Sequence, residues 1–385
     1  MSWVKIGDAV EITNTRVKPF KGERQYLATG DLSDDGVDGL VTVDYESRPS
    51  RADLLVDEGD FVVARMKATN KVMLIDSAAS DFIVSTGFLT LKPKKEFNSR
   101  YLYHHFRSSC FQDQKDMRCS GATQKAINNA AFYELRVPKV SLDKQAEIAG
   151  IFDLVERLGQ ERKKALQLIN DFIRATFLEM FGDPLSKKPK FPVVRLGDVV
   201  DFCGGGTPSR AIPEYYQGKH KWASSKDMKG LILRDTQERV SEKAIEKCAT
   251  KLVKAGTLLI VVKSKILMRY LPVMIAGTEV CFNQDIKGIS PSKEVNPWYL
   301  LFHLRIGQNA LLRVARGANT EGLTLDHLRE YDLIKAPKDL QDKFSGIAQK
   351  AVALSEKMQE GQSALNNQFN ALTQKYFHDN DTGEE

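Results

Sequence analysis

The chain has 385 residues, enough for two or three domains with cores of their own. Its hydrophobic fraction of 42% and charged fraction of 28% are ordinary for a water-soluble protein. The sequence has no apolar run near the roughly 18 residues of a membrane span, no signal-peptide pattern and no C-x-x-C pair among its five cysteines, so we expect a reduced, cytoplasmic protein that binds no membrane.

The net charge of +6 is unevenly distributed. Residues 193–339 hold 23 Lys and Arg against 16 Asp and Glu, a difference of +7. A basic globular segment favours a polyanionic partner.

One long internal repeat organises the chain, and it sets the expected architecture. Each half begins with a short strand-like segment containing Gly-Asp, continues through about 140 residues and ends in a long helical pattern. The matched segments are Trp3–Ile12 with Val193–Phe202, Tyr26–Leu32 with Trp222–Met228, Leu55–Gly59 with Leu252–Gly256, and Phe97–Leu102 with Val295–Leu300.

Each globular segment has a mixed α and β pattern. Short apolar runs predict buried strands, two of them directly after a glycine (Gly59 and Gly256), and a segment with helical spacing comes after them. The predicted strands are Asp60–Arg65, Asp81–Leu91, Thr257–Val262 and Glu279–Ile289, and the predicted helices are Arg100–Phe111 and Pro297–Leu312. The stretch before each long helix contains turn formers and is interpreted as a loop.

The long helices are predicted from apolar residues at alternating four- and three-residue steps. The first covers about Leu142–Phe181, and Gly182 and Pro184 end it. Arg162 is a charged residue at one of the apolar positions of the first helix, and Gly361 stands at one of the apolar positions of the second helix. The residues predicted to form the seam are Ile151, Val155, Leu158, Ile169 and Phe172 in the first helix, and Ile347, Leu354, Met358, Leu365 and Leu372 in the second.

These patterns predict an α+β protein with two tandem mixed α/β domains, each followed by a long helix. The two helices are expected to form an antiparallel coiled coil with pseudo-two-fold symmetry. The predicted segments are a first domain at 1–141, a helix at 142–183, a linker at 184–192, a second domain at 193–339 and a helix at 340–378.

Catalytic motifs are missing from the sequence. The run Cys203–Pro208 contains three glycines but lacks the Walker form, so a flexible turn is favoured over a phosphate loop. No amino-methyltransferase tetrapeptide and no H-E-x-x-H occurs. Asp285 and Lys287 could belong to a metal-dependent nuclease, but no paired acidic residue stands nearby. We expect a chain with no catalytic residue, no metal site and no cofactor of its own.

Basic and polar loops recur at matched places in the two halves and are the candidate DNA contacts. Cations suit phosphates, while Arg, Lys, Asn and Gln can also bind base edges. The alternative, a solvated surface, remains open. The candidates are Arg65, Lys67, Thr69, Asn70, Lys71, Gln124 and Lys125 in the first half, and Lys226, Lys263, Lys265, Arg269, Arg316, Asn319 and Thr320 in the second.

The chain resembles the specificity subunits of type I restriction–modification enzymes along nearly its whole length. The segment from Gly205 to Arg210, continued by Glu214–Tyr216, Trp222 and Ser225–Asp227, is similar to the opening of many target-recognition domains in that family. The end of the central helix, Leu178–Pro184, is also typical. The first half departs from this opening, with Thr13–Lys18 at that place.

This resemblance implies two target-recognition domains that read the halves of a bipartite double-stranded DNA target, with the long helices as spacers. It also implies two methylation subunits, which use S-adenosylmethionine, and motor–nuclease restriction subunits, which use ATP and Mg²⁺. The alternatives are the recognition subunit of a methylation-only or other phage-defence complex, a nuclease, and a coiled-coil assembly protein without a DNA role.

Overall fold

The computed structural model describes residues 2–33, 36–122, 124–248, 250–317 and 322–378. The chain divides into two compact units. Unit 1 comprises Met1–Arg162 and Glu360–Glu385, and unit 2 comprises Lys163–Gln359. Each unit therefore contains one globular region and one part of each long helix.

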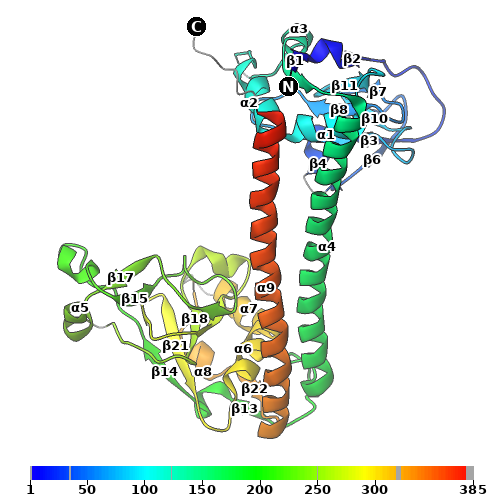
Figure 1. Ribbon diagram of the computed structural model, residues 1–385. Helices are drawn as coiled ribbons and strands as arrows, with labels where there is room; N and C mark the ends of the chain where they lie inside the picture. The colour runs from blue at the N-terminus through cyan, green and yellow to red at the C-terminus, as the bar shows by residue number, and fades with distance from the viewer. Residues whose placement is uncertain (1, 34–35, 123, 249, 318–321, 379–385) are drawn as a thin grey trace. The chain divides into compact units, whose positions relative to one another are not determined.

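Unit 1 is built from two four-stranded sheets and three short helices (Figure 1). One sheet has the order β2-β11-β8-β9, formed by Val10–Ile12, Phe88–Pro93, Phe61–Ala64 and Val72–Leu74. The other has the order β6-β3-β10-β7, formed by Val41–Val43, Arg24–Leu27, Ile83–Ser85 and Ala52–Leu55. The remaining elements are β1 (Ser2–Lys5), the 3-10 helices η1 (Ile6–Asp8) and η2 (Thr29–Asp31), β4 (Leu32–Ser33), β5 (Gly36–Val37), α1 (Ser99–Arg107), α2 (Ser109–Met117), α3 (Asn129–Tyr133) and β12 (Arg136–Lys139).

Unit 2 repeats this construction with one five-stranded and one three-stranded sheet. The orders are β14-β21-β18-β19-β16, formed by Val200–Gly204, Ile286–Pro291, Leu258–Val261, Val273–Ala276 and Ile232–Leu233, and β17-β15-β20, formed by Glu238–Val240, His220–Ala223 and Cys281–Phe282. The remaining elements are β13 (Val193–Arg195), the 3-10 helices η3 (Leu196–Asp198), η4 (Pro213–Tyr216) and η5 (Lys265–Met268), α5 (Glu242–Lys247), α6 (Pro297–Ile306), α7 (Gln308–Gly317), α8 (Leu325–Arg329) and β22 (Asp332–Ile334).

The repeat extends to strand register. In unit 1, β3 and β10 are parallel, with Tyr26 opposite Ile83. In unit 2, β15 and β20 are parallel, with Trp222 opposite Cys281. Tyr26 and Trp222 therefore occupy the same place in the two units.

Several predicted elements are interrupted where a polar or glycine residue breaks them. The run 81–91 forms β10 and β11, and the run 279–289 forms β20 and β21. Ser108 ends α1 and caps α2 by accepting a hydrogen bond from the Phe111 amide. The predicted loops before the long helices were wrong, because β12 pairs with β1 and β22 pairs with β13.

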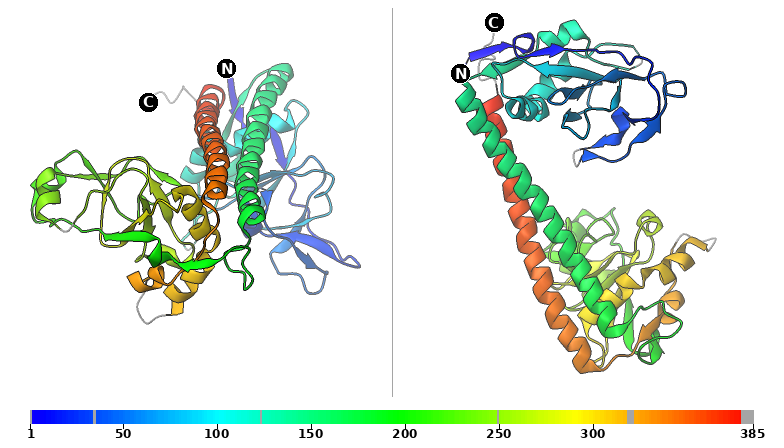
Figure 2. Two further views of the ribbon diagram at one scale, coloured as in Figure 1. Left: turned by 90° about the horizontal axis from the view of Figure 1, so that it is seen from below. Right: turned by 90° about the vertical axis from the view of Figure 1, so that its right-hand side faces the viewer.

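The long helices α4 (Leu142–Phe181) and α9 (Lys338–Phe377) pack in antiparallel order within each unit (Figures 1 and 2). In unit 1 the ring of Phe152 lies 5.2 Å from that of Phe369 and 5.2 Å from that of Phe377. In unit 2 the ring of Phe177 lies 5.3 Å from that of Phe344. Aromatic contacts between the ends of the helices therefore anchor both globular regions.

The buried stripe is rotated from the predicted seam. Leu158, Phe172 and Leu354 are 42%, 53% and 52% exposed, so their prediction as seam residues was wrong. Ile169 and Leu372 do pack against the cores of units 2 and 1, and Leu365 is buried, while Ile151, Val155, Ile347 and Met358 are half-buried. The helices turn toward the face with the larger side chains, including Phe152 and Phe177, because burying these rings removes more apolar area from water.

A repeated buried glutamine joins each long helix to its own globular region. The Gln145 carbonyl accepts a hydrogen bond of 2.7 Å from the Asn98 amide, and its side-chain amide donates to the Glu96 and Val140 carbonyls. Gln341 makes the same three bonds with Asn296, Glu294 and Ala336. The two glutamines together satisfy four backbone carbonyls and two backbone amides where each long helix begins.

Candidate nucleic-acid interface

Two loops that are far apart in the sequence lie side by side in unit 1. The Lys67 amide donates to the Lys125 carbonyl at 2.9 Å, and the Ile127 amide donates to the Arg65 carbonyl at 2.9 Å. The Arg65 amide donates in turn to the Gly87 carbonyl at 3.0 Å. We call the resulting surface, formed by residues 28–30, 51, 65–71, 85–87 and 124–127, the unit 1 edge.

Unit 2 has an equivalent surface. The Val262 amide donates to the Asp285 carbonyl at 2.8 Å, and the Leu323 amide donates to the Val262 carbonyl at 2.7 Å. A Cβ on Gly322 would lie 2.6 Å from the Val262 carbonyl oxygen, so the close approach of these loops needs glycine there. Residues 205–207, 224–226, 262–270, 283–285, 316 and 322–323 form the unit 2 edge.

The fourteen sequence candidates fall into four groups: exposed cations, residues whose side chains make hydrogen bonds, residues outside the described part of the chain, and the internally bonded Arg65 and Lys71. Six cations are exposed and have no hydrogen-bond or ion-pair partner among the described residues: Lys67, Lys125, Lys226, Lys263, Lys265 and Arg269. Four other candidates make hydrogen bonds through their side chains. Thr69 bonds the Lys67 carbonyl, and Asn70 bonds the Arg107 carbonyl. Gln124 bonds the Met66 sulfur, and Arg316 bonds the Met268 carbonyl. Asn319 and Thr320 lie outside the described residues.

Arg65 and Lys71 form internal contacts in place of the free cationic surface that we expected. The Arg65 guanidinium donates to the Phe88 carbonyl at 3.0 Å and to the Asn129 side chain at 2.7 Å, and burial lowers its pKa. The Lys71 ammonium donates to the Thr29 carbonyl at 2.8 Å. Both side chains hold the unit 1 edge together, so we remove them from the set of direct DNA contacts.

Lys115 of α2 stabilises the unit 1 edge from the interior of the unit. This residue was not predicted from the sequence. Its fully buried ammonium lies 2.7 Å from the Thr69 carbonyl, 3.3 Å from that of Met66 and 3.4 Å from that of Ala64. Burial lowers the pKa of Lys115. A lysine on an amphipathic helix gives no sequence signal of such a position, because the carbonyls that receive it come from a loop about 46 residues away.

The glycine-rich run at 204–206 is held in place by close packing at Gly205 and by hydrogen bonds of Gly206, so the predicted flexible turn was wrong. A Cβ on Gly205 would lie 2.3 Å from the carbonyl oxygens of Phe282 and Asn283. The Gly206 amide donates to the Phe282 carbonyl at 2.9 Å, and the Trp222 indole donates to the Gly206 carbonyl at 3.0 Å. The absence of side chains brings Thr207 onto the unit 2 edge, where its hydroxyl bonds Gln284.

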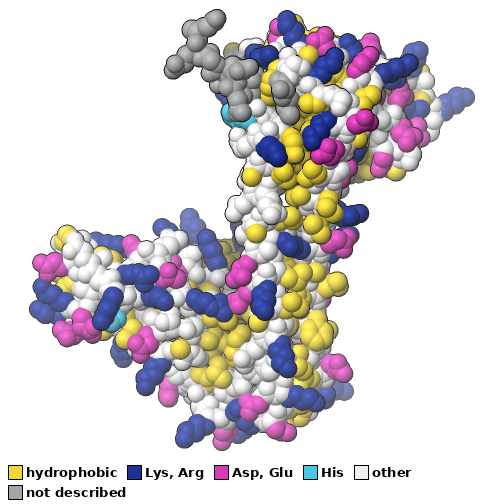
Figure 3. All heavy atoms as spheres, in the orientation of Figure 1, with side chains coloured by type: hydrophobic (Ala, Val, Ile, Leu, Met, Phe, Trp, Pro, Cys, Tyr) yellow, Lys and Arg dark blue, Asp and Glu magenta, His cyan; other side chains and the backbone are white. Residues whose placement is uncertain are grey.

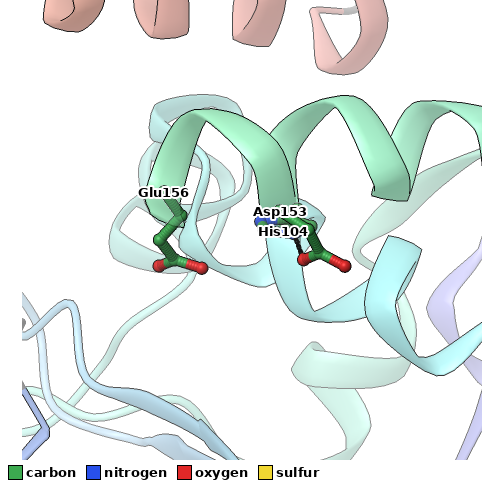
Figure 4. A group of neighbouring side chains, drawn as sticks. All are labelled: His104, Asp153 and Glu156. Carbon is green, nitrogen blue, oxygen red and sulfur yellow. Dashed lines mark hydrogen bonds and ion pairs between the residues drawn. The ribbon is translucent and has the colours of Figure 1, made fainter. Parts of the chain in front are cut away.

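One group of side chains in the described residues has the composition of a metal site: His104, Asp153 and Glu156 (Figure 4). Arg100 Nε lies 2.9 Å from Asp153 Oδ1, His104 Nε2 lies 2.7 Å from the same oxygen, and Arg107 pairs with Glu156. Burial would raise the pKa of Asp153, but hydrogen bonds from Arg100 and His104 outweigh it and leave that pKa lowered. Two guanidinium groups already neutralise these carboxylates, so the group is an ion-pair network that fastens α1 to α4.

No helix within the described residues is both long and apolar enough to cross a bilayer. Asp285, the acidic residue of the rival nuclease interpretation, lies outside the carboxylate group described above and accepts a hydrogen bond of 3.1 Å from the Asn283 side chain.

The chain is similar to proteins of one family. The family model described as "Type I restriction modification DNA specificity domain" matches residues 2–168 and 189–353. The specificity subunit of the type I restriction enzyme EcoR124I/EcoR124II from Escherichia coli is 27% identical over 229 residues. That alignment covers 58% of this chain and 55% of the relative, so the chain spans about half the length of that protein.

Two solved structures share the fold. A type I restriction–modification S subunit from M. genitalium has a TM-score of 0.62 at 15% identity, over 98% of this chain and 96% of that one. A chain from a study of the assembly and conformational transition of a type I R-M system has a TM-score of 0.59 at 19% identity, over 98% and 97%. The family model matches most of both repeats, and the chain therefore belongs to the family of type I restriction–modification DNA specificity domains.

Proposed function

We propose that this chain is the DNA-recognition subunit of a type I restriction–modification complex and has no catalytic role of its own. Residues 1–141 and 193–339 are its two target-recognition domains, and each binds one half of a bipartite target. The observation that carries the proposal is the repeated edge, because each unit brings distant loops to one surface. The exposed cations there, Lys67 and Lys125 in unit 1 and Lys263, Lys265 and Arg269 in unit 2, have no hydrogen-bond or ion-pair partner in the described part of the chain.

Exposed lysines suit the phosphate backbone, because their charges neutralise phosphates and thereby release the counterions condensed on DNA. Polar side chains between them, such as Gln124 and Thr207, supply hydrogen bonds that discriminate base edges. The cations of the edges divide into two kinds, according to whether their side chains bond internal carbonyls or are exposed. Arg65, Lys71 and Lys115 hold the loops, and the free lysines contact DNA.

The partners in this proposal are methylation subunits that carry S-adenosylmethionine, with ATP- and Mg²⁺-dependent motor–nuclease subunits in the complete complex. Helix α4 provides a surface for the former. It exposes Leu154 and Leu158 in unit 1 and Leu168 and Phe172 in unit 2, at 47%, 42%, 67% and 53%. Figure 3 shows hydrophobic side chains along α4 on the face in view, as expected of a helix that is covered in a complex.

The test is long-read detection of modified adenines in the genome of cells that express the methylation subunit with or without this chain. We expect a bipartite, gapped motif that requires the chain. A stable complex that produces no new motif would contradict the proposal. Plating of phage with and without the motor–nuclease subunits then distinguishes a restricting complex from a methylation-only one.

A further inference from the structure

The unit 1 edge contains an open hollow of about 520 Å³. Tyr26, Arg51, Arg65, Thr86 and Gln124 are among its lining residues. These side chains come from five separate segments. Backbone bonds of Arg65 with Gly87 and Ile127 and of Thr86 with Arg51 join four of them, and Tyr26 lies on the neighbouring strand β3.

The corresponding place in unit 2 is covered. Trp222 occupies the position of Tyr26, and the glycine-rich segment lies over it, with the Trp222 indole bonded to the Gly206 carbonyl. The Thr207 hydroxyl also bonds the side chain of Gln284. Gln284 is the counterpart of Thr86 in unit 1, because each lies three residues after the strand residue that pairs with Trp222 or Tyr26, namely Cys281 or Ile83. The first half lacks the glycine run, and this difference in sequence leaves the hollow open in unit 1.

Arg51 is the unpartnered charge of the hollow. Its carbonyl accepts a hydrogen bond of 2.9 Å from the Thr86 amide, which fixes its backbone just before β7. Its exposed guanidinium has no partner among the described residues, whereas that of Arg65 is already bonded to Phe88 and Asn129. Among the described residues that line the hollow there is no Asp or Glu to neutralise the charge of Arg51.

The surrounding groups suit a base edge better than a phosphate. The guanidinium fork matches the N7 and O6 acceptors of guanine in the major groove, and the Gln124 amide and Thr86 hydroxyl can bond a neighbouring base. No lysine is among the described residues that line the hollow. Lys67 and Lys125, the free lysines of this edge, are next to the lining residues Met66 and Gln124 in the sequence and can contact phosphates on either side.

We propose that Arg51 is a specificity-determining residue that reads a guanine in the half-site bound by unit 1. The inference rests on the proposed function, and it assigns the hollow to one base pair of one half-site. The other half-site, read by unit 2 with its covered surface, does not depend on Arg51.

Arg51→Ala and Arg51→Lys test this in the chain co-expressed with its methylation subunits. We expect both variants to copurify with these subunits and to melt at the wild-type temperature, because the Arg51 side chain has no hydrogen-bond or ion-pair partner within the described ranges. In the methylated motif, one guanine position of one half should become degenerate, while the other half and the gap stay the same. Competition between duplexes altered at that position should show discrimination reduced about 10- to 100-fold.

The lysine variant separates base reading from charge. It keeps the positive charge but lacks the planar fork, so it should still lose discrimination while binding all duplexes more tightly than the alanine variant. An unchanged motif with uniformly weaker binding by Arg51→Ala, restored by Arg51→Lys, would show a phosphate contact and overturn the inference. Failure of the variants to assemble would show a structural role and would also overturn it. If the wild-type complex gives no bipartite motif, that result contradicts the proposed function. A wild-type motif that Arg51→Ala leaves unchanged contradicts only the role of Arg51, so the two outcomes are distinguishable.

Discussion

Arg162 of α4 donates a hydrogen bond to the backbone carbonyl of Gly361 in α9. Both residues belong to unit 1. Arg162 is the charged residue, and Gly361 the glycine, that interrupts the apolar stripe of its helix. A Cβ on Gly361 would lie 3.0 Å from the Arg162 guanidinium. Two irregularities that look unrelated in the sequence are therefore one contact, in which the missing side chain makes room for the long one.

Gly361→Leu should destabilise unit 1. Leucine favours the helix by about 1 kcal/mol over glycine, but overpacking against Arg162 costs about 1–3 kcal/mol. Adding Arg162→Ala should recover the loss, and thermal or denaturant unfolding of the four variants gives the coupling. Gly150→Leu is the matched control, because its Cβ position has no neighbour within 4 Å. Additive effects of the two changes would contradict the interpretation.

Lys263→Ala combined with Lys265→Ala should weaken DNA binding by the complex and reduce its dependence on salt. Each phosphate contact contributes about 0.9 to the slope of log K against log salt concentration, so losing two should lower the slope by roughly 1.8. The measurement is duplex binding over a salt series. Lys187→Ala with Lys188→Ala removes the same charge from the exposed linker and should leave the slope unchanged. An unaltered slope in the first variant would remove this loop from the interface.

Insertion of four helical residues near Gly159 should change the gap between the half-sites without changing the half-sites. Four residues add about 6 Å of helix and one base-pair step is about 3.4 Å, so we expect a change of one or two base pairs. Mapping of methylated motifs measures both properties at once. A changed half-site sequence would show that α4 does not act as a spacer.

Acid should destabilise unit 2 through His303. Its buried Nε2 accepts a hydrogen bond of 3.1 Å from the Ile334 amide, and burial lowers the pKa of His303 from 6.5 to about 3. The unfolded chain therefore takes up a proton as the pH falls below about 6.5, whereas the folded chain does not until about 3. Stability is lost across that window, at up to about 1.4 kcal/mol per pH unit.

The check is the melting temperature of the wild type and of His303→Phe between pH 7 and pH 4. The variant loses the bond to Ile334 and should be less stable at pH 7, by about 1–3 kcal/mol. Its melting temperature should then fall less steeply with acid. Parallel curves would contradict a neutral, buried His303.

Many features of the candidate site followed from local sequence. Lys67, Lys125 and Lys263 sit in loops between predicted elements, where a charged side chain needs no partner and stays exposed. Arg65 and Lys71 carry the same charge in the same loop, yet they bond internal carbonyls. The choice depends on which acceptors the fold brings within reach, and composition does not encode that.

Sequence by itself determined the twofold repeat, the two long helices and the positions of the basic loops, because periodicity and self-similarity are local properties of the chain. Tertiary structure alone decided the rotation of the helix stripe, the pairing of Arg162 with Gly361, the supports formed by Lys115 and Gln145, and the open hollow around Arg51. Each of these depends on the close approach of segments distant in the chain, where side-chain volume and unsatisfied backbone groups select the contact.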